Sequence, residues 1–247
     1  MELVQRACTL LRLLCPDRDH DDWGVSDLAG RSGLPLATVH RLLDALRSQG
    51  LVQKDPQSRR YRLGFGLLQI ALPLLESLEV RKVAYPIMVN LSKATGEAVY
   101  LTLRDGLHAI AVERVDSPQW VRMVQPVGLR LPLHLGASRK IILAYLPQKM
   151  LEHYFSHFPK ARMLERQLRT IRRQGYAVSR QEVTDWSASV AAPIFNYRGE
   201  VFAGICASGP RERFSADVIP PTARHVAEAA RTISRLMGYE VNRTMPS

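Results

Sequence analysis

Cysteine is scarce in this chain of 247 residues, and its three copies follow no recognisable pattern. Cys8, Cys15 and Cys206 are odd in number and lack the paired spacing of a zinc site or a disulfide framework. Because Cys8 and Cys15 lie two turns apart on one expected helix, we predict buried thiols rather than metal ligands or redox sensors.

Long apolar segments are also missing. No apolar run approaches the length that spans a bilayer, and the N-terminus lacks the basic, apolar and small-residue order of a signal peptide. With 46% hydrophobic and 23% charged residues, the composition is typical of a soluble globular protein with room for two domains. We therefore expect a cytoplasmic protein without a membrane partner.

The sequence lacks the common catalytic motifs. It has no Gly-x-Ser-x-Gly elbow, no Walker loop and no His-Glu-x-x-His, and Gly64 and Gly66 lack the third glycine of a dinucleotide site. His153 and His157 lie one helical turn apart, but no nearby Asp or Cys completes a metal site, so a solvated pair is favoured. We predict no catalytic residues, no metal and no cofactor, and a metabolic enzyme remains a weak alternative.

Positive charge is abundant and unevenly placed. The net charge is +11, yet residues 1–78 hold ten basic and nine acidic residues, and residues 79–247 hold 24 and 14. Residues 31–62 hold seven basic and two acidic residues, whereas acidic residues crowd at Asp17, Asp19, Asp21 and Asp22. This local excess suggests a polyanionic partner for residues 31–62.

Two short helices are predicted between Ser26 and Gly50. Ser26 is a suitable N-cap for the first helix, and Gly33 supplies the left-handed residue that ends it. Pro35 suits the start of the second helix. Residues at helical spacing form its inward stripe: Leu36, Val39, Leu42, Leu43 and Leu46. A first amphipathic helix over residues 3–14 supports the pair.

The other face of the second helix suits a DNA major groove. It presents small or hydrogen-bonding side chains near its N-terminus, namely Ala37, Thr38, His40 and Arg41. Strand-period residues follow at 51–54 and 59–63 around the turn Asp55-Pro56-Gln57-Ser58, and they form a hairpin. The hairpin projects the cations expected to meet phosphates: Lys54, Arg59, Arg60 and Arg62. The alternative is a small helical domain for protein contacts.

The rest of the chain reads as a linker helix followed by an α+β domain. Residues 67–78 are apolar on more than one side, which predicts a dimerising helix that Pro73 kinks or interrupts. Strands are expected at 98–103, 108–115, 121–124, 131–135, 176–179, 187–195 and 201–207. Helices are expected at 80–95, 137–145, 150–155, 162–174 and 223–237.

Two groups of segments carry a family resemblance. The segment from Gly33 to Leu43 closely resembles the recognition helix of IclR-family transcriptional regulators, and residues 131–140 resemble the family's effector-domain signature. Residues 173–176, 190–195 and 208–210 match its closing segments in the same order. The resemblance spans nearly the whole chain and implies a winged helix-turn-helix followed by a GAF-like domain that binds a small organic acid or aromatic effector.

The opening of the helix at Gly136-Ala137-Ser138 suits a carboxylate on residue-level grounds, because it presents free N–H groups and the positive end of the helix dipole. A plain helix cap is the alternative. Similarity to the family adds pocket positions on predicted strands, each of which could instead be an ordinary strand residue: Ser179, Ser189, Cys206 and Ser208. Arg139 and Trp186 depart from the family pattern, where small residues or glycine are usual.

These expectations define three segments: a DNA-binding domain at 1–63, a linker and dimerisation helix at 64–78, and an effector domain at 79–247. By resemblance, the protein is expected to be a homodimer, or a dimer of dimers, on a roughly palindromic operator. Effector binding would change the spacing of the two winged helices. The sequence does not decide between repressor and activator.

Overall fold

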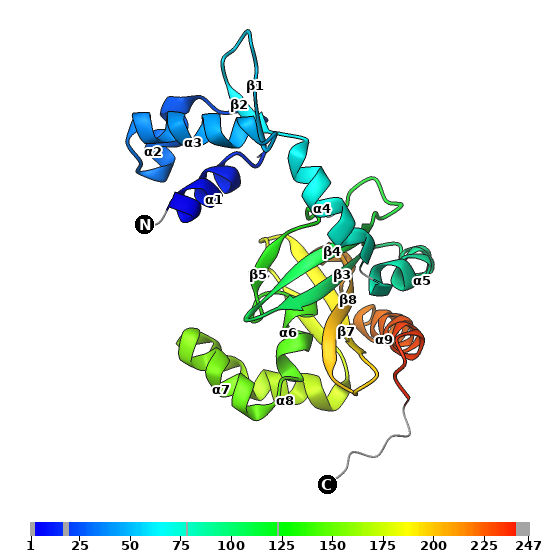
Figure 1. Ribbon diagram of the computed structural model, residues 1–247. Helices are drawn as coiled ribbons and strands as arrows, with labels where there is room; N and C mark the ends of the chain where they lie inside the picture. Colours follow the sequence, from blue (N-terminus) through cyan, green and yellow to red (C-terminus); the bar gives the residue numbers. More distant parts are fainter. Residues whose placement is uncertain (1–2, 17–19, 78, 123, 241–247) are drawn as a thin grey trace. The chain divides into compact units, whose positions relative to one another are not determined.

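The computed structural model describes residues 3–16, 20–77, 79–122 and 124–240, with 73–77 as backbone only. The chain divides into two compact units, Met1–Ser77 and Leu78–Ser247. Figure 1 shows a helical first unit with a small hairpin and a second unit built on a larger sheet. The predicted α+β class is confirmed. Within the described residues, no helix is both long and apolar enough to cross a membrane.

Three helices build most of the first unit: α1 (Leu3–Leu13), α2 (Val25–Ser32) and α3 (Leu36–Ser48). Gly24, and not the predicted Ser26, caps α2, because the Asp27 carboxylate accepts a hydrogen bond from the Gly24 N–H at 3.2 Å. Gly33 ends α2 with φ of 67°, as predicted. The turn that follows leads into α3, which packs against α2.

The three helices share one core with the hairpin. It consists of Leu10, Leu14, Trp23, Leu28, Val39, Leu42, Leu43, Leu46, Val52 and Tyr61. Leu36, expected in the inward stripe of α3, is instead 48% exposed, and Leu3 of α1 is 59% exposed. Both are the first residues of their helices, and each buried stripe begins three or more residues later.

The wing is a two-stranded antiparallel hairpin, β1 (Val52–Lys54) and β2 (Tyr61–Leu63). Asp55 organises its turn, since Oδ1 accepts hydrogen bonds from the N–H groups of Gln57 at 2.9 Å and Ser58 at 2.7 Å. Trp23 adds a bridge to Tyr61 through two backbone hydrogen bonds of 2.8 Å. The wing is therefore tied to the loop before α2.

Gly50, Gly64 and Gly66 form a close backbone contact at the base of the wing. The N–H of Gly66 donates to Gly50 O at 3.0 Å, and a Cβ on Gly64 would lie 2.1 Å from that same oxygen. A side chain cannot fit at Gly64 without moving backbone. Close backbone packing thus explains why glycine occupies positions 64 and 66, which do not form a dinucleotide-binding motif.

Helix α4 (Gly66–Ser77) completes the first unit. It continues past Pro73, so the proline does not end the helix. Leu68, Ile70 and Leu72 are 50%, 67% and 47% exposed. The expected apolar positions Leu74, Leu75 and Leu78 lie outside the residues whose side chains are described.

The second unit contains a six-stranded antiparallel sheet of order β5-β4-β3-β8-β7-β6. The strands are β3 (Ala98–Asp105), β4 (His108–Val115), β5 (Arg130–Pro132), β6 (Ala177–Arg180), β7 (Ser187–Phe195) and β8 (Val201–Pro210). The helices are α5 (Glu79–Thr95), α6 (Ala137–Ala144), α7 (Gln148–His157), α8 (Glu165–Gln174) and α9 (Ile219–Leu236).

Alternating side chains give this sheet two buried faces. Val99 and Leu101 of β3 pack with α5 and α9, whereas Ala98 and Tyr100 pack with α6, α7 and α8. Helices therefore cover both faces, as Figure 1 shows for α6 on one side and α9 on the other. The face beneath α6 holds the candidate effector site.

Three sequence predictions are wrong in detail. No strand forms at 121–124 within the described residues there, and the predicted strand 131–135 is limited to β5. Val121 and Val124 are 66% and 54% exposed, and Gln125 N–H donates to the Tyr100 hydroxyl at 3.0 Å, so this segment is a loop attached to β3 through Gln125. The predicted helix at 162–174 begins as a 3-10 turn, Pro159–Leu164, before α8.

The prediction that Cys8 and Cys15 are buried thiols is wrong. Cys8 and Cys15 are exposed, and Cys15 lies beyond the end of α1 at Leu13. The helix stops before the second thiol can join the buried stripe. Cys206, in the centre of β8, is buried.

Candidate DNA-binding surface and effector cavity

The predicted recognition face lies on the solvent side of α3. Ala37, His40 and Arg41 are exposed and Thr38 is half-buried, while Val39, Leu42 and Leu43 on the other side fill the core. Pro35 caps the start of the helix, and its carbonyl accepts hydrogen bonds from the N–H groups of Thr38 and Val39 at 2.9 and 3.1 Å. The four predicted side chains therefore lie in the first two turns of a well-anchored helix.

Three of the four predicted wing cations are exposed: Lys54, Arg59 and Arg62. Arg59 has a left-handed backbone with φ of 58°, a region that non-glycine residues other than Asn and Asp seldom adopt. Its N–H donates to Asp55 O at 3.0 Å, which closes the turn at the wing tip.

Arg60 differs from the other wing cations because it already has a carboxylate partner. Its Nε lies 2.5 Å from Asp22 Oδ1, and its Nη2 donates to Asp22 O at 3.1 Å. This pair joins the wing to the loop before α2, in the acidic stretch seen in the sequence. Phosphate binding by Arg60 stays a prediction, and the phosphate would compete with Asp22.

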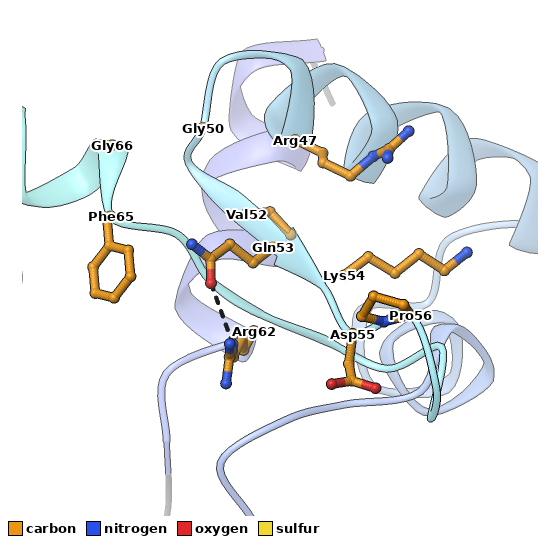
Figure 2. A pocket seen from close by; sticks show the side chains of 10 residues that line it. All are labelled: Arg47, Gly50, Val52, Gln53, Lys54, Asp55, Pro56, Arg62, Phe65 and Gly66. Carbon is orange, nitrogen blue, oxygen red and sulfur yellow. Dashed lines mark hydrogen bonds between the residues drawn. The ribbon is translucent and has the colours of Figure 1, made fainter.

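A hollow of about 440 Å³ lies between the end of α3 and the wing, and Figure 2 shows its lining. Arg47, Lys54 and Arg62 supply three cations to it, and Arg62 Nε donates to Gln53 Oε1 at 3.3 Å across the hairpin. Arg47 was not singled out in the sequence. Its polar, exposed place in α3 gives no periodic signal, and only the fold brings it beside the wing.

The predicted effector residues gather around one small cavity of about 20 Å³ beneath α6. Six of the seven line it: Gly136, Ala137, Ser138, Ser189, Cys206 and Ser208. Ser179 is buried and pairs in register with Ser189 on the neighbouring strand, one strand away from the lining. The cavity is also lined by residues that sequence reasoning missed, namely Tyr100, Thr102, Ala111, Gln125 and Val183.

The N-terminus of α6 closes one wall of this cavity. The first helical hydrogen bond runs from Lys140 N to Gly136 O at 3.0 Å, so the N–H groups of Ala137, Ser138 and Arg139 precede the helical ladder. Ser138 Oγ accepts a hydrogen bond from Thr102 Oγ1 at 3.1 Å. Helix α6 is thus held over the sheet with its positive end at the cavity.

Glu182 already supplies one carboxylate near this helix end. Its Oε2 accepts the Gly136 N–H at 3.0 Å, and its Oε1 pairs with Lys140 Nζ. Lys140 is fully buried and also donates to Val178 O at 3.1 Å. The pair pins the loop after β6 to the start of α6.

The two residues that depart from the family pattern, Arg139 and Trp186, differ in whether they line the cavity. Arg139 is 3% exposed and lines the cavity, so it points inward. Trp186 is 43% exposed and does not line the cavity. Val183, in the loop that also holds Trp186, covers Gly136 instead. A Cβ added to Gly136 would lie 3.0 Å from Val183 Cγ2. The loop narrows the cavity through Val183.

The predicted histidine pair is exposed on α7, with ring centroids 4.5 Å apart. Across the described part of the chain, no three His, Cys, Asp or Glu side chains gather in a group able to hold a metal ion.

Taken together, a recognition helix with a solvent-facing polar surface, a basic wing and a separate α+β unit define a winged helix-turn-helix protein of the regulator type.

Comparison with known proteins identifies the family. Residues 3–56 match the IclR helix-turn-helix domain, and residues 73–235 match the C-terminal domain of the bacterial transcriptional regulator IclR. The chain therefore belongs to the IclR family of transcriptional regulators, as the resemblance implied.

Individual relatives agree with this assignment. The HTH-type transcriptional regulator KipR of Bacillus subtilis is 34% identical over 87% of this chain and 90% of its own length. The HTH-type transcriptional repressor AllR of Escherichia coli K12 is 28% identical over 98% of this chain and 92% of its own. These relatives are regulators, which confirms the prediction that the chain is not an enzyme.

Solved structures give the same result. The Thermotoga maritima IclR structure is 29% identical, with a TM-score of 0.74 over 96% of this chain and 98% of its own. An IclR homologue from Microbacterium hydrocarbonoxydans, complexed with 4-hydroxybenzoate, is 25% identical, with a TM-score of 0.79 over 96% of this chain and 99% of its own.

Proposed function

We propose that the protein binds a DNA operator through α3 and the wing of its first unit. Ala37, Thr38, His40 and Arg41 read base edges in the major groove, and Lys54, Arg59 and Arg62 contact flanking phosphates. Arg60 joins them where phosphate outcompetes Asp22. The observation that carries this proposal is the exposed polar face of α3 beside three exposed wing cations.

The second unit is proposed to be a GAF-like effector domain that controls DNA binding. Its effector is a small organic or aromatic acid whose carboxylate meets the N–H groups at the start of α6. Ser138, Ser189, Cys206 and Ser208 supply further polar contacts in the cavity, with Ser179 behind them. The homologue complexed with 4-hydroxybenzoate supports this class of ligand.

The regulator is proposed to act in the cytoplasm as a homodimer, or a dimer of dimers, on a roughly palindromic operator. The exposed side chains of Leu68, Ile70 and Leu72 on α4 support dimerisation, because a partner helix would remove them from water. The segments divide as 1–63 for DNA binding, 64–78 for the linker and 79–247 for the effector. An effector that prefers one arrangement of the linker helices shifts the population of DNA-binding dimers.

Fluorescence anisotropy on DNA from upstream of the chain's own gene tests the DNA interface. We expect Arg41→Ala to weaken specific binding by about 10- to 100-fold, the effect of losing one good base contact of 1–3 kcal/mol. The matched control is Arg12→Ala, an exposed arginine on α1 that lies outside the proposed surface.

Equal affinities for Arg41→Ala and Arg12→Ala would contradict the assigned recognition face. Absence of any sequence-specific binding by the wild-type protein, with or without carboxylates, would favour the protein-interaction alternative for the helix-turn-helix unit.

A further inference from the structure

Arg139 is a buried cation that has no carboxylate partner among the residues the structure describes. It is 3% exposed, and its one hydrogen bond within the described residues runs from Nη2 to Leu129 O at 3.4 Å. Its Nε is buried and has no acceptor there. Burying an unpaired charge is costly, so a residue of this kind needs an explanation outside the apo fold.

The guanidinium lies where a ligand carboxylate would enter. A Cβ on Gly136 would be 3.5 Å from Arg139 Nη1, which places the guanidinium beside the start of α6. Arg139, Gly136 and Cys206 all line the same cavity. The side chain therefore returns toward the N-terminus of its own helix and adds a full positive charge to the helix dipole.

The neighbouring groups that the structure describes do not neutralise the charge of Arg139. Glu182, the nearby carboxylate, is already paired with Lys140. Burial raises the pKa of the Cys206 thiol to about 11, so at neutral pH it is uncharged. Burial also lowers the pKa of Arg139, yet a guanidinium stays protonated inside proteins. The two buried cations, Arg139 and Lys140, and the one carboxylate, Glu182, therefore leave an excess of one positive charge.

We propose that Arg139 is the specificity-determining residue that binds the effector's carboxylate and restricts the site to small anions carrying one such group. This inference rests on the proposed effector site and names the group that recognises the ligand. The guanidinium donates two parallel hydrogen bonds to the carboxylate oxygens, while the N–H groups of Ala137 and Ser138 donate from the helix end. The missing acceptor of Nε is the ligand.

Size sets a second limit on the ligand. The cavity of about 20 Å³ has room for roughly one water molecule. A larger acid therefore enters only when Val183, which covers Gly136, moves aside. Short or planar carboxylates require the smallest displacement of this loop.

Calorimetry and thermal shift on the full chain test the proposal with three acids and their neutral partners: pyruvate, benzoate and 4-hydroxybenzoate against pyruvamide, benzamide and 4-hydroxybenzamide. We expect at least one acid to bind wild-type protein and its amide to bind at least tenfold more weakly. Arg139→Met should weaken the binding of that acid by about 10- to 100-fold, because a hydrogen bond to a charged group is worth about 1.5–3 kcal/mol. Arg139→Lys should recover part of the affinity.

Two comparisons separate recognition from packing. Arg166→Met, on an exposed arginine of α8, should bind the acid as wild type does. Ligand-free Arg139→Met should melt at or above the wild-type temperature, because it removes an unpaired buried charge. Melting well below wild type, together with unchanged acid affinity, would overturn the proposal. So would amides that bind as well as acids, or no binding by any acid.

This experiment is distinct from the test of DNA binding. If the acids bind through Arg139 but the protein ignores DNA, the regulatory function fails and the assignment of Arg139 stands. If operator binding is intact and the acids bind equally well to Arg139→Met, the assignment fails and the regulatory function stands.

Discussion

Glu182→Gln should destabilise the second unit more than an ordinary loss of an ion pair. Lys140 is 0% exposed and the Glu182 side chain is 28% exposed, so the substitution leaves a fully buried ammonium without its counter-charge. Breaking a buried pair costs 3–5 kcal/mol. Partial exposure of Glu182 reduces this cost, and the amide still accepts the Gly136 N–H, so we expect a loss of about 2–3 kcal/mol.

The loss is measurable as a fall in melting temperature. For a unit of this size, 1 kcal/mol corresponds to roughly 2–4 °C, so Glu182→Gln should melt about 4–12 °C lower in calorimetry at neutral pH. The matched control is Glu152→Gln. Its pair with Arg162 is about half exposed on both sides, and its removal should cost under about 1 kcal/mol.

A double substitution tests the reasoning directly. Lys140→Met combined with Glu182→Gln removes both charges of the pair and should be more stable than Glu182→Gln alone, since the buried ammonium that lost its partner is gone. If Glu182→Gln and Glu152→Gln lose the same stability, or if the double variant is less stable than the single one, the buried pair does not hold the loop as argued.

Two further predictions concern the wing and the thiols. Arg59→Asn should leave the melting temperature unchanged or raised, because Asn tolerates the left-handed backbone of φ 58°, while the salt slope of DNA binding falls by about one unit; an unchanged slope would mean that Arg59 touches no phosphate. In a thiol-labelling assay of the intact protein at pH 8, Cys8 and Cys15 should react quickly and Cys206 slowly, because the pKa of Cys206 is raised to about 11. Its labelling rate should rise about tenfold per pH unit toward that value, and a fast third thiol at pH 8 would contradict the burial described.

Periodic patterns predicted most of the fold. The buried faces of α3 and α5, the β3–β4 hairpin and the long strands β7 and β8 repeat at helix or strand spacing, and packing against one core enforces that spacing. The prediction failed where apolar residues had no neighbour to cover them. Val121 and Val124 have the apolar character of a strand but are exposed in a loop, so no core selects that conformation.

Local chemistry also limited the prediction of helix ends and thiols. Ser26 suits an N-cap, but the cap is Gly24, two residues earlier, whose N–H donates a hydrogen bond to the Asp27 side chain. Cys15 follows the helical spacing of Cys8, yet α1 ends at Leu13. Caps and ends depend on single hydrogen bonds, which a periodic pattern does not contain.

The effector cavity was partly visible in the sequence. The helix opening at Gly136 and the small residues of β7 and β8 converge on it, because cross-strand register aligns Ser189 with Ser208. The sequence could not decide whether Arg139 points into the cavity or outward, because the same residue can adopt either orientation. Glu182 and Val183 were missed because they come from an irregular loop whose path only tertiary packing defines.

The contact of Gly50, Gly64 and Gly66 has a consequence for chimeric regulators. Backbone touches backbone at this point, so the end of α3, the wing and the first turn of α4 are packed together as one piece. A fusion that joins this DNA reader to a foreign sensor should therefore keep the native chain through Gly66 and change partners further along α4. A junction placed before Gly64 would lose the contact between the DNA-binding unit and the first turn of α4.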